Sequence, residues 1–165
     1  MANLNKTREN IDRDFDALVS AMHSSEWQAR GMMAPEQRIL RSMQSQGITL
    51  LTADEVCSMR TTTDTDPLKT LTDEYRRGAV LGIHIKSEWR YPDFQFDQNG
   101  MVKPSTRAFL KYILESGGHE HGGWDVVSWL VSGNAALDYF SPFKWLDSRP
   151  DDVHQASRVF FSKDE

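Results

Sequence analysis

The residues from 89 to 97 read Trp89-Arg90-Tyr91-Pro92-Asp93-Phe94-Gln95-Phe96-Asp97. Aromatic and polar residues alternate up to the proline, as in a short strand, and an aromatic-Gln-aromatic step follows. Asn99-Gly100 then predicts a turn. We therefore expect a junction here, with a hairpin-containing module before it and a helical module after it. The aromatic side chains of the stretch would pack the hairpin against the helical part.

Residues 1–48 predict a helical hairpin. Apolar residues recur at helical spacing from about Thr7 to His23. A second helix is expected from Pro35, which suits a first helical turn, to a stop at Gly47. We expect this segment to serve assembly or dimerisation, so that the predicted state is a homo-oligomer.

Residues 49–98 predict a helix-turn-helix-like module that begins with two helix caps. Thr52 and Glu55 form a capping-box pattern, in which the Thr hydroxyl accepts from the Glu55 amide and the Glu carboxylate reaches back to the Thr52 amide. Asp66-Pro67 predicts a cap followed by a proline in the first turn of the next helix. Two short helices are therefore expected, joined by a Thr-rich turn.

The second of these helices would turn Leu68, Leu71 and Tyr75 inward. Two short strands around a tight turn at Lys86-Ser87-Glu88 follow it. Two helices and a hairpin in this order resemble a winged helix, a shape that binds DNA in many proteins.

The charges are the test of that DNA-binding hypothesis. Six basic residues stand against five acidic ones between Arg60 and Arg90, and the whole chain carries a net charge of −5. Phosphate contacts supply most of non-specific DNA affinity, so a packing or assembly role for the module remains an equal alternative. The candidate DNA contacts are Thr61, Thr62, Thr63, Lys69, Arg76, Arg77 and Lys86.

Residues 99–165 predict a small helical domain. Helices are expected to open at Pro104, after Gly123 and near Pro150, where acidic residues suit a helix N-terminus; the last would turn Val153, Ala156 and Phe160 to one face. His119-Glu120-His121 offers two imidazoles and a carboxylate, but no fourth ligand stands nearby. We expect a solvated loop there rather than a metal site.

Length and composition exclude several classes. The 165 residues contain no apolar run long enough to span a bilayer, and the start of the chain lacks a signal-peptide core, so we expect a cytoplasmic protein without membrane contacts. The single cysteine, Cys57, cannot form an internal disulfide and is expected to be a small buried hydrophobe. Phosphate-loop, nucleophile-elbow and zinc-protease motifs are all missing from the sequence. We therefore expect a binding protein without a cofactor rather than an enzyme.

The second half contains three blocks whose order and spacing are distinctive. The first is Arg90-Tyr91-Pro92-Asp93-Phe94-Gln95-Phe96-Asp97, followed by Gly100 and Pro104. The middle is Gly123-Trp124, Trp129-Leu130, Asn134 and Leu137, and the last is Ser141-Pro142-Phe143-Lys144-Trp145-Leu146. Together these blocks resemble the toxin-binding domain of the Xre/MbcA/ParS antitoxin family, and the resemblance covers the chain from about Trp89 onward.

The resemblance implies a mainly α protein, with the winged-helix-like module followed by a toxin-binding domain. It implies an antitoxin that blocks the active site of a RES-domain toxin, an enzyme that consumes NAD, and that binds its own promoter in complex with it. Carried onto this sequence, the partner-binding residues are Trp124, Trp129, Asn134, Phe140, Ser141, Trp145, Phe160 and Phe161. We expect at least half of the tryptophans to belong to an ordinary core.

Two other functions stay open on the sequence. The chain would be a stand-alone DNA-binding transcriptional regulator if it has kept the domain and lost the toxin. It would be a mobile-element inhibitor of another enzyme if the acidic, aromatic C-terminal half has a different target.

Overall fold

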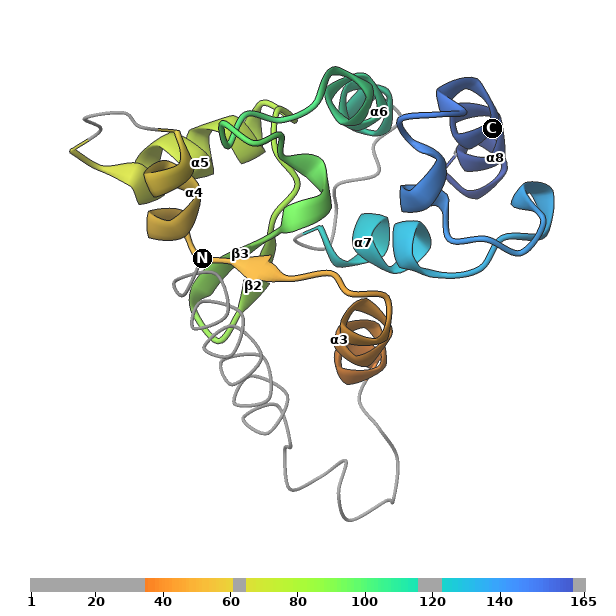
Figure 1. The fold of residues 1–165 in the computed structure, drawn as a ribbon, viewed down its shortest axis with the longest axis horizontal. Helices are drawn as coiled ribbons and strands as arrows, with labels where there is room; N and C mark the ends of the chain where they lie inside the picture. Colours follow the sequence, from red (N-terminus) through yellow and green to blue (C-terminus); the bar gives the residue numbers. More distant parts are fainter. Residues whose placement is uncertain (1–34, 61–64, 116–122, 162–165) are drawn as a thin grey trace, which may run out of the picture. The chain divides into compact units, whose positions relative to one another are not determined.

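The computed structural model describes residues 35–60, 65–115 and 123–161, and within them the protein is mainly helical with a small sheet (Figure 1). The chain divides into two compact units, Met1–Leu50 and Leu51–Glu165. Among the residues that the structure describes, no helix is long and apolar enough to cross a membrane. The helix expected from Thr7 to His23 lies outside the described residues.

The described part of the first unit is helix α3 (Pro35–Ser45) and the turn after it. Gln37, Leu40 and Met43 recur every three residues and are buried. Gly47 takes a φ of +74°, and the Ile48 amide donates to the Met43 carbonyl at 2.9 Å. This bond closes the helix end in the manner of a Schellman motif, which confirms the expected stop at Gly47.

The second unit opens with helix α4 (Ala53–Met59), whose cap forms in part as predicted. The Glu55 amide donates to Thr52 Oγ1 at 3.1 Å. The second predicted bond, from the Thr52 amide to the Glu55 carboxylate, has a different donor in the structure. The Thr52 hydroxyl donates to Glu55 Oε1 at 3.2 Å. A hydroxyl can accept one hydrogen bond and donate another, so one side chain serves both partners.

Helix α5 (Pro67–Arg76) begins at the predicted cap, where Asp66 Oδ1 accepts from the Lys69 amide at 3.2 Å. Its buried position is Leu71, and Tyr75 is half-buried against the ring of Trp89, 4.6 Å away between ring centroids. The expectation for Leu68 is wrong, since this side chain is 50% exposed. The inward face of α5 therefore begins one turn later than the sequence spacing indicates.

The predicted hairpin consists of the antiparallel strands β2 (Ile83–Ile85) and β3 (Glu88–Pro92). Its turn residues, Lys86 and Ser87, have φ values of 47° and 67°. Two successive left-handed residues make a turn whose twist matches that of the strands. The sheet order is β1-β3-β2, where β1 is the two-residue strand Leu50–Leu51. That strand was not predicted, because two residues are too few to show an alternating pattern.

One core cluster lies beneath these elements and reaches beyond the hairpin. Helices α4 and α5 pack on each other, and α4 also packs on β3. The buried members of the cluster are Leu51, Val56, Leu71, Val80, Tyr91, Phe96 and Val102.

Gln95, in the short 3-10 helix η1 (Asp93–Gln95), is buried and fixes the start of the hairpin. Its Oε1 accepts from the Leu81 amide, and its Nε2 donates to the Leu81 carbonyl, both at 2.7 Å. Nε2 also donates to the Pro92 carbonyl at 3.0 Å. A side chain thus takes the place of a strand neighbour for Leu81, and these bonds hold the segment from Trp89 to Asp97 against the start of the hairpin.

Gly100 marks the predicted turn and comes close to the end of α4. Its φ is +72°, and a Cβ atom there would lie 2.8 Å from the Met59 Cβ. The Gly100 carbonyl accepts from Arg60 Nε at 2.9 Å. The position therefore needs glycine both for its backbone conformation and for its space.

The rest of the second unit consists of three helices and two short 3-10 segments. Helix α6 is Pro104–Glu115, α7 is Trp124–Val131 and α8 is Pro150–Phe161, with η2 (Ala135–Leu137) and η3 (Pro142–Trp145) between α7 and α8. Helix α8 packs on α6, η2 and η3, and α7 packs on η3. All three helices were predicted at these places from their opening residues.

Contacts join the two sides of the boundary predicted between residues 98 and 99. Trp124 Nε1 donates to the His84 carbonyl at 3.3 Å, and the rings of Phe94 and Phe143 lie 5.1 Å apart. Residues 51–165 form one compact unit by their contacts. The finer division into modules 49–98 and 99–165 stays a prediction.

Candidate partner-binding surface

Residues 132–141 form a loop whose hydrogen bonds converge on Asn134. The Asn134 carbonyl accepts from the Tyr139 amide at 2.9 Å, and its amide donates to the Phe140 carbonyl at 3.2 Å. The side-chain Oδ1 accepts from the Ala136 amide at 2.9 Å and caps η2. One residue therefore ties both sides of the loop together and holds it in a defined conformation.

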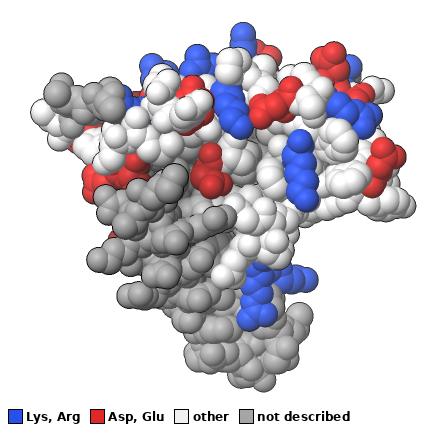
Figure 2. Space-filling model, in the orientation of Figure 1, with Lys and Arg blue, Asp and Glu red and all other residues white. Residues whose placement is uncertain are grey.

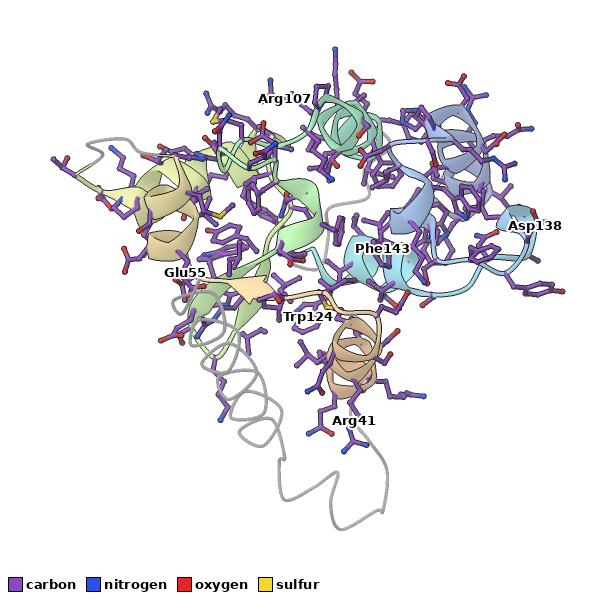
Figure 3. All side chains as sticks on the ribbon, viewed as in Figure 1. Arg41, Glu55, Arg107, Trp124, Asp138 and Phe143 are labelled. Carbon is purple, nitrogen blue, oxygen red and sulfur yellow. The ribbon has the colours of Figure 1, made fainter. Side chains whose placement is uncertain are left out.

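The outer end of this loop presents an aromatic ring in an unusual backbone conformation. Asp138 and Tyr139 have φ values of 54° and 64°, and Figure 3 shows Asp138 where the loop turns back. The left-handed region costs a residue with a Cβ atom about 1–2 kcal/mol. The Tyr139 side chain is nevertheless 79% exposed, so packing of its ring on the part of the chain that the structure describes offsets little of that cost. Such strain is found more often at functional sites than elsewhere.

Phe140 and Trp145 form the second part of the surface. Their rings meet edge to face, with centroids 5.4 Å apart, and Phe140 remains 48% exposed. The Arg149 guanidinium lies over the Trp145 ring at 4.8 Å from its centroid. Trp145 Nε1 is buried and has no hydrogen-bond partner among the described residues. The two rings therefore form a packed pair that joins the end of the 132–141 loop to η3.

The end of α8 contributes two more exposed apolar side chains. Val159 is 87% exposed and Phe160 is 60% exposed. Phe161 is buried, and its ring meets the Trp129 ring edge-on at 5.7 Å. The expectation that Phe160 faces inward with Val153 is wrong because Phe161 takes the buried position, and the next residue along a helix is turned by about 100°.

We call the set of exposed and half-buried side chains on these elements the aromatic surface. Helix α8 packs on both η2 and η3, which brings the loop, the Phe140–Trp145 pair and the helix end onto neighbouring elements. The members of the aromatic surface are Tyr139, Phe140, Trp145, Val159 and Phe160.

Other residues expected to bind a partner lie beneath or beside this surface. Trp129 is buried between the Phe109 ring, stacked at 5.8 Å, and the Phe161 ring. Ser141 is buried, and its hydroxyl donates to the Val131 carbonyl at 3.1 Å. Their contacts support the loop and the helix that carry the exposed rings.

Trp124 and Asn134 also make structural contacts. Trp124 is held against the hairpin by its bond to His84, and the Gly123 that precedes it has a φ of +83°. A Cβ atom at Gly123 would collide with the Gly82 carbonyl, so the chain approaches β2 here as only glycine allows.

Tyr139 and Val159 were missed on the sequence. Val159 carries a misleading signal, because it lies three residues after the buried Ala156 and helical spacing therefore places it close to the buried face, yet it is 87% exposed. Tyr139 carries none, since an aromatic residue in a loop is as often packed as exposed. Its exposure depends on the left-handed backbone, which the residue types do not predict.

The candidate DNA contacts lie on α5 and on the hairpin turn. Lys69, Arg76 and Arg77 are exposed on α5 and its C-terminal end, and Lys86 is exposed at the first turn position. Arg76 has a long ion pair with Asp73, at 4.0 Å. Thr61, Thr62 and Thr63 lie outside the described residues. Figure 2 shows basic and acidic side chains interspersed on the face that it presents, with no field of a single sign.

The titratable side chains of the described residues show no cluster with the make-up of a metal site. Within ranges 35–60, 65–115 and 123–161, no group of three His, Cys, Asp or Glu side chains could hold a metal ion. His119-Glu120-His121 lies outside those ranges. Cys57 is half-buried beside the core cluster. Burial, with a contribution from Glu74, raises the pKa of Tyr91 to about 12, so its hydroxyl stays protonated at neutral pH.

No protein-family model matches the chain, and no curated protein matches it. A solved structure, the NMR structure of Rv2175c, is similar over 67% of this chain and 75% of its own, at 17% identity and a TM-score of 0.47. A similarity this low supports no statement about function.

Proposed function

We propose that this protein is an antitoxin-like inhibitor that binds and blocks a cognate toxin through the aromatic surface. The observation that carries the proposal is the 79% exposure of Tyr139 on a loop closed by Asn134. The partner that the sequence resemblance implies is a NAD-consuming enzyme with a RES domain, and the setting that we propose is the cytoplasm. The action is stoichiometric inhibition, without a cofactor or catalysis by this chain.

The physical support for this proposal is the combination of exposed rings and a fixed frame. Aromatic side chains supply much of the binding energy at protein interfaces, especially in desolvated centres. A loop already held in its conformation by hydrogen bonds loses less conformational entropy on binding than a free one. Phe140 has such a frame as well, since its carbonyl accepts a hydrogen bond from the Asn134 amide and its ring packs edge-on against the Trp145 ring.

The test is rescue of growth when the chain is co-expressed with a RES-domain enzyme encoded beside it. The wild type should restore growth, and the double variant Tyr139→Ser with Phe140→Ser should fail to do so. Leu68→Ser is the matched control, because Leu68 is exposed to a similar degree, 50% against 48% for Phe140, and lies on α5. Rescue by the double variant at equal protein level would overturn the proposed role of this surface.

Removal of α8 is not a clean test of the same proposal. Val153, Ala156, Ser157 and Phe161 are buried along the helix, so deleting residues 150–165 would expose the core. Val159→Ser with Phe160→Ser keeps these buried residues and removes two exposed apolar side chains. This variant should lose rescue while remaining folded.

A second proposed function is DNA binding by α4, α5 and the β2–β3 hairpin as a winged-helix-like module. The observation that favours it is the exposure of Lys69 and Arg76, which are seven residues apart and thus on one side of α5. Lys86 would contact the backbone from the hairpin turn. The double variant Lys69→Gln with Arg76→Gln should bind DNA from upstream of its own gene more weakly than the wild type does. The affinity of the variant should also depend less on salt concentration. Absence of a wild-type shift at low salt would refute this function.

The remaining alternatives make different use of the same surfaces. A stand-alone regulator would bind DNA in the absence of any toxin. An inhibitor of another enzyme would not restore growth of cells that express a RES-domain toxin. Self-association through residues 1–48 stays a prediction that analytical ultracentrifugation of the full chain would test.

A further inference from the structure

A cavity of about 370 Å³ lies where α5 ends and α6 begins. Its lining includes Arg60, Glu74, Arg77 and Arg107, with Ala79 and Val102 on the apolar side. Arg77 is the residue that caps α5, and Arg107 stands in the first turns of α6, where Figure 3 labels it. Residues far apart in the sequence therefore meet in this pocket.

One of the three arginines is bound in place and neutralised. Arg60 Nη1 and Nη2 donate to the two carboxylate oxygens of Glu74 at 2.9 and 3.0 Å, and Nε donates to the Gly100 carbonyl at 2.9 Å. Both side chains are largely buried. This two-bond ion pair is rigid and uses the charge of the one glutamate in the lining.

The other two arginines have no carboxylate of their own. Arg77 and Arg107 are exposed, and neither has a side-chain hydrogen bond or ion pair among the residues that the structure describes. Three arginines and one glutamate leave two formal positive charges on the lining. The pocket therefore holds two guanidinium groups that are available to an anion.

We propose that this pocket binds the phosphate group of a small phosphorylated molecule, such as a nucleoside monophosphate. Guanidinium groups donate parallel N–H bonds to phosphate oxygens, and two of them match the two charges of a phosphate monoester. The volume falls in the range of small-ligand sites, roughly 300–1,000 Å³. Ala79 and Val102 offer an apolar wall for the part of the ligand that carries no charge.

A small ligand fits the electrostatics better than a polyanion does. The lining carries two formal positive charges, which match one phosphate monoester and would leave the neighbouring phosphates of a polyanion in this pocket without partners in the lining. A single phosphate monoester responds mainly to the two nearest cations. The site shares Arg77 with the candidate DNA contacts, adds Arg107, which is distant in sequence from all of them, and is independent of the aromatic surface.

The test is NMR titration of the full chain, observing the arginine side-chain N–H signals, with inorganic phosphate, with adenosine monophosphate and with adenosine. Phosphate and the nucleotide should shift the Arg77 and Arg107 signals to saturation, and adenosine should not. Arg107→Gln and Arg77→Gln should each weaken binding by about tenfold or more. Arg76→Gln is the matched control and should bind as the wild type does.

Several results would overturn the proposal. These are a wild-type titration that does not saturate, saturable shifts of the remaining arginine signals in Arg77→Gln with Arg107→Gln, or an equal response to sodium chloride at the same ionic strength. Binding of a DNA duplex through both arginines, without binding of either small phosphate, would also overturn it. Tyr139→Ser with Phe140→Ser should leave phosphate binding unchanged, so failure of the inhibitor function would not be mistaken for failure of this site.

Discussion

The ring of Phe140 meets the ring of Trp145 edge-on, with centroids 5.4 Å apart and planes at 83°. This pair connects the end of the 132–141 loop to the segment that leads into α8. Because Phe140 is only partly covered by it, the contact fixes the ring while leaving a face to solvent. A rigid exposed ring is well suited to binding another protein, since little side-chain freedom remains to be lost.

Asn134→Ala should weaken partner binding and cost some stability. The change removes the acceptor for the Ala136 amide, and loss of a side-chain cap costs about 0.5–2 kcal/mol. The loop that carries Tyr139 would then sample other conformations. Affinity for the toxin and urea unfolding should be measured together. Asn134→Asp keeps an acceptor oxygen and serves as the control; equal affinity of wild type and Asn134→Ala would show that the loop needs no such support.

Gln95→Leu should destabilise the protein strongly. Two buried backbone groups of Leu81 would lose their partner, and each unsatisfied buried group costs about 1–3 kcal/mol. The control is Gln98→Leu, at an exposed glutamine three residues away. Urea denaturation should give a much lower midpoint for the first variant only. Similar midpoints would mean that Leu81 finds other partners.

Comparing Gly100→Ala with Gly47→Ala separates the two reasons why a position needs glycine, namely a left-handed backbone and a lack of space for a Cβ atom. Both positions have a φ near +70°, at +72° and +74°, so alanine should cost each about 1–2 kcal/mol for the left-handed backbone. Only at Gly100 would the new Cβ collide, at 2.8 Å from the Met59 Cβ. Thermal unfolding should therefore show a larger loss for Gly100→Ala, and equal losses would contradict the close packing of this turn on α4.

Stability should fall as the pH drops below about 6.5, through His154. Burial lowers the pKa of this imidazole from 6.5, with a smaller lowering by Arg158 that opposes the raising effect of Asp151. A lowered folded-state pKa means that the neutral form is favoured in the folded protein, so stability is full above the ordinary pKa and is lost as protons bind below it. The imidazole contacts the rings of Phe109 and Tyr112 on α6, with centroid distances of 5.9 and 5.8 Å.

His154→Phe should remove this dependence between pH 7 and pH 5. A second, separate loss should appear near and below pH 3.8, because hydrogen bonds from Ser105 and Lys103 lower the pKa of Asp147 from that value. Urea midpoints of both proteins across the range would test this. An unchanged slope in His154→Phe between pH 7 and pH 5 would assign the acid sensitivity to other groups.

The local elements were largely predictable from particular residues. Thr52 and Asp66 predicted two helix starts, and Lys86-Ser87-Glu88 predicted the hairpin turn. These features depend on residues close together in sequence, where capping and turn preferences act. The two-residue strand β1 has no such signal, and the bonds of Gln95 to Leu81 join residues that are fourteen positions apart.

The candidate site was less predictable, because exposure depends on which face an element turns to its neighbours. Phe160 and Phe161 are adjacent and chemically identical, yet one is exposed and the other packs on Trp129. Helical spacing allows either residue to continue the buried face of α8. Arg107 gave no signal at all, since its proximity to Arg77 arises only when α5 and α6 meet.

The most direct measurement of the central claim is inhibition of NAD consumption by the proposed partner, a purified RES-domain enzyme, titrated with this chain. Wild type and Leu68→Ser should inhibit at a stoichiometric ratio. The double variant Tyr139→Ser with Phe140→Ser should reach the same inhibition only at a concentration about 30-fold higher or more. This factor is expected when side chains that contribute about 2 kcal/mol are removed from an interface. If the double variant inhibits as well as wild type, or wild type fails to inhibit, the aromatic surface is not the toxin-binding site of this protein.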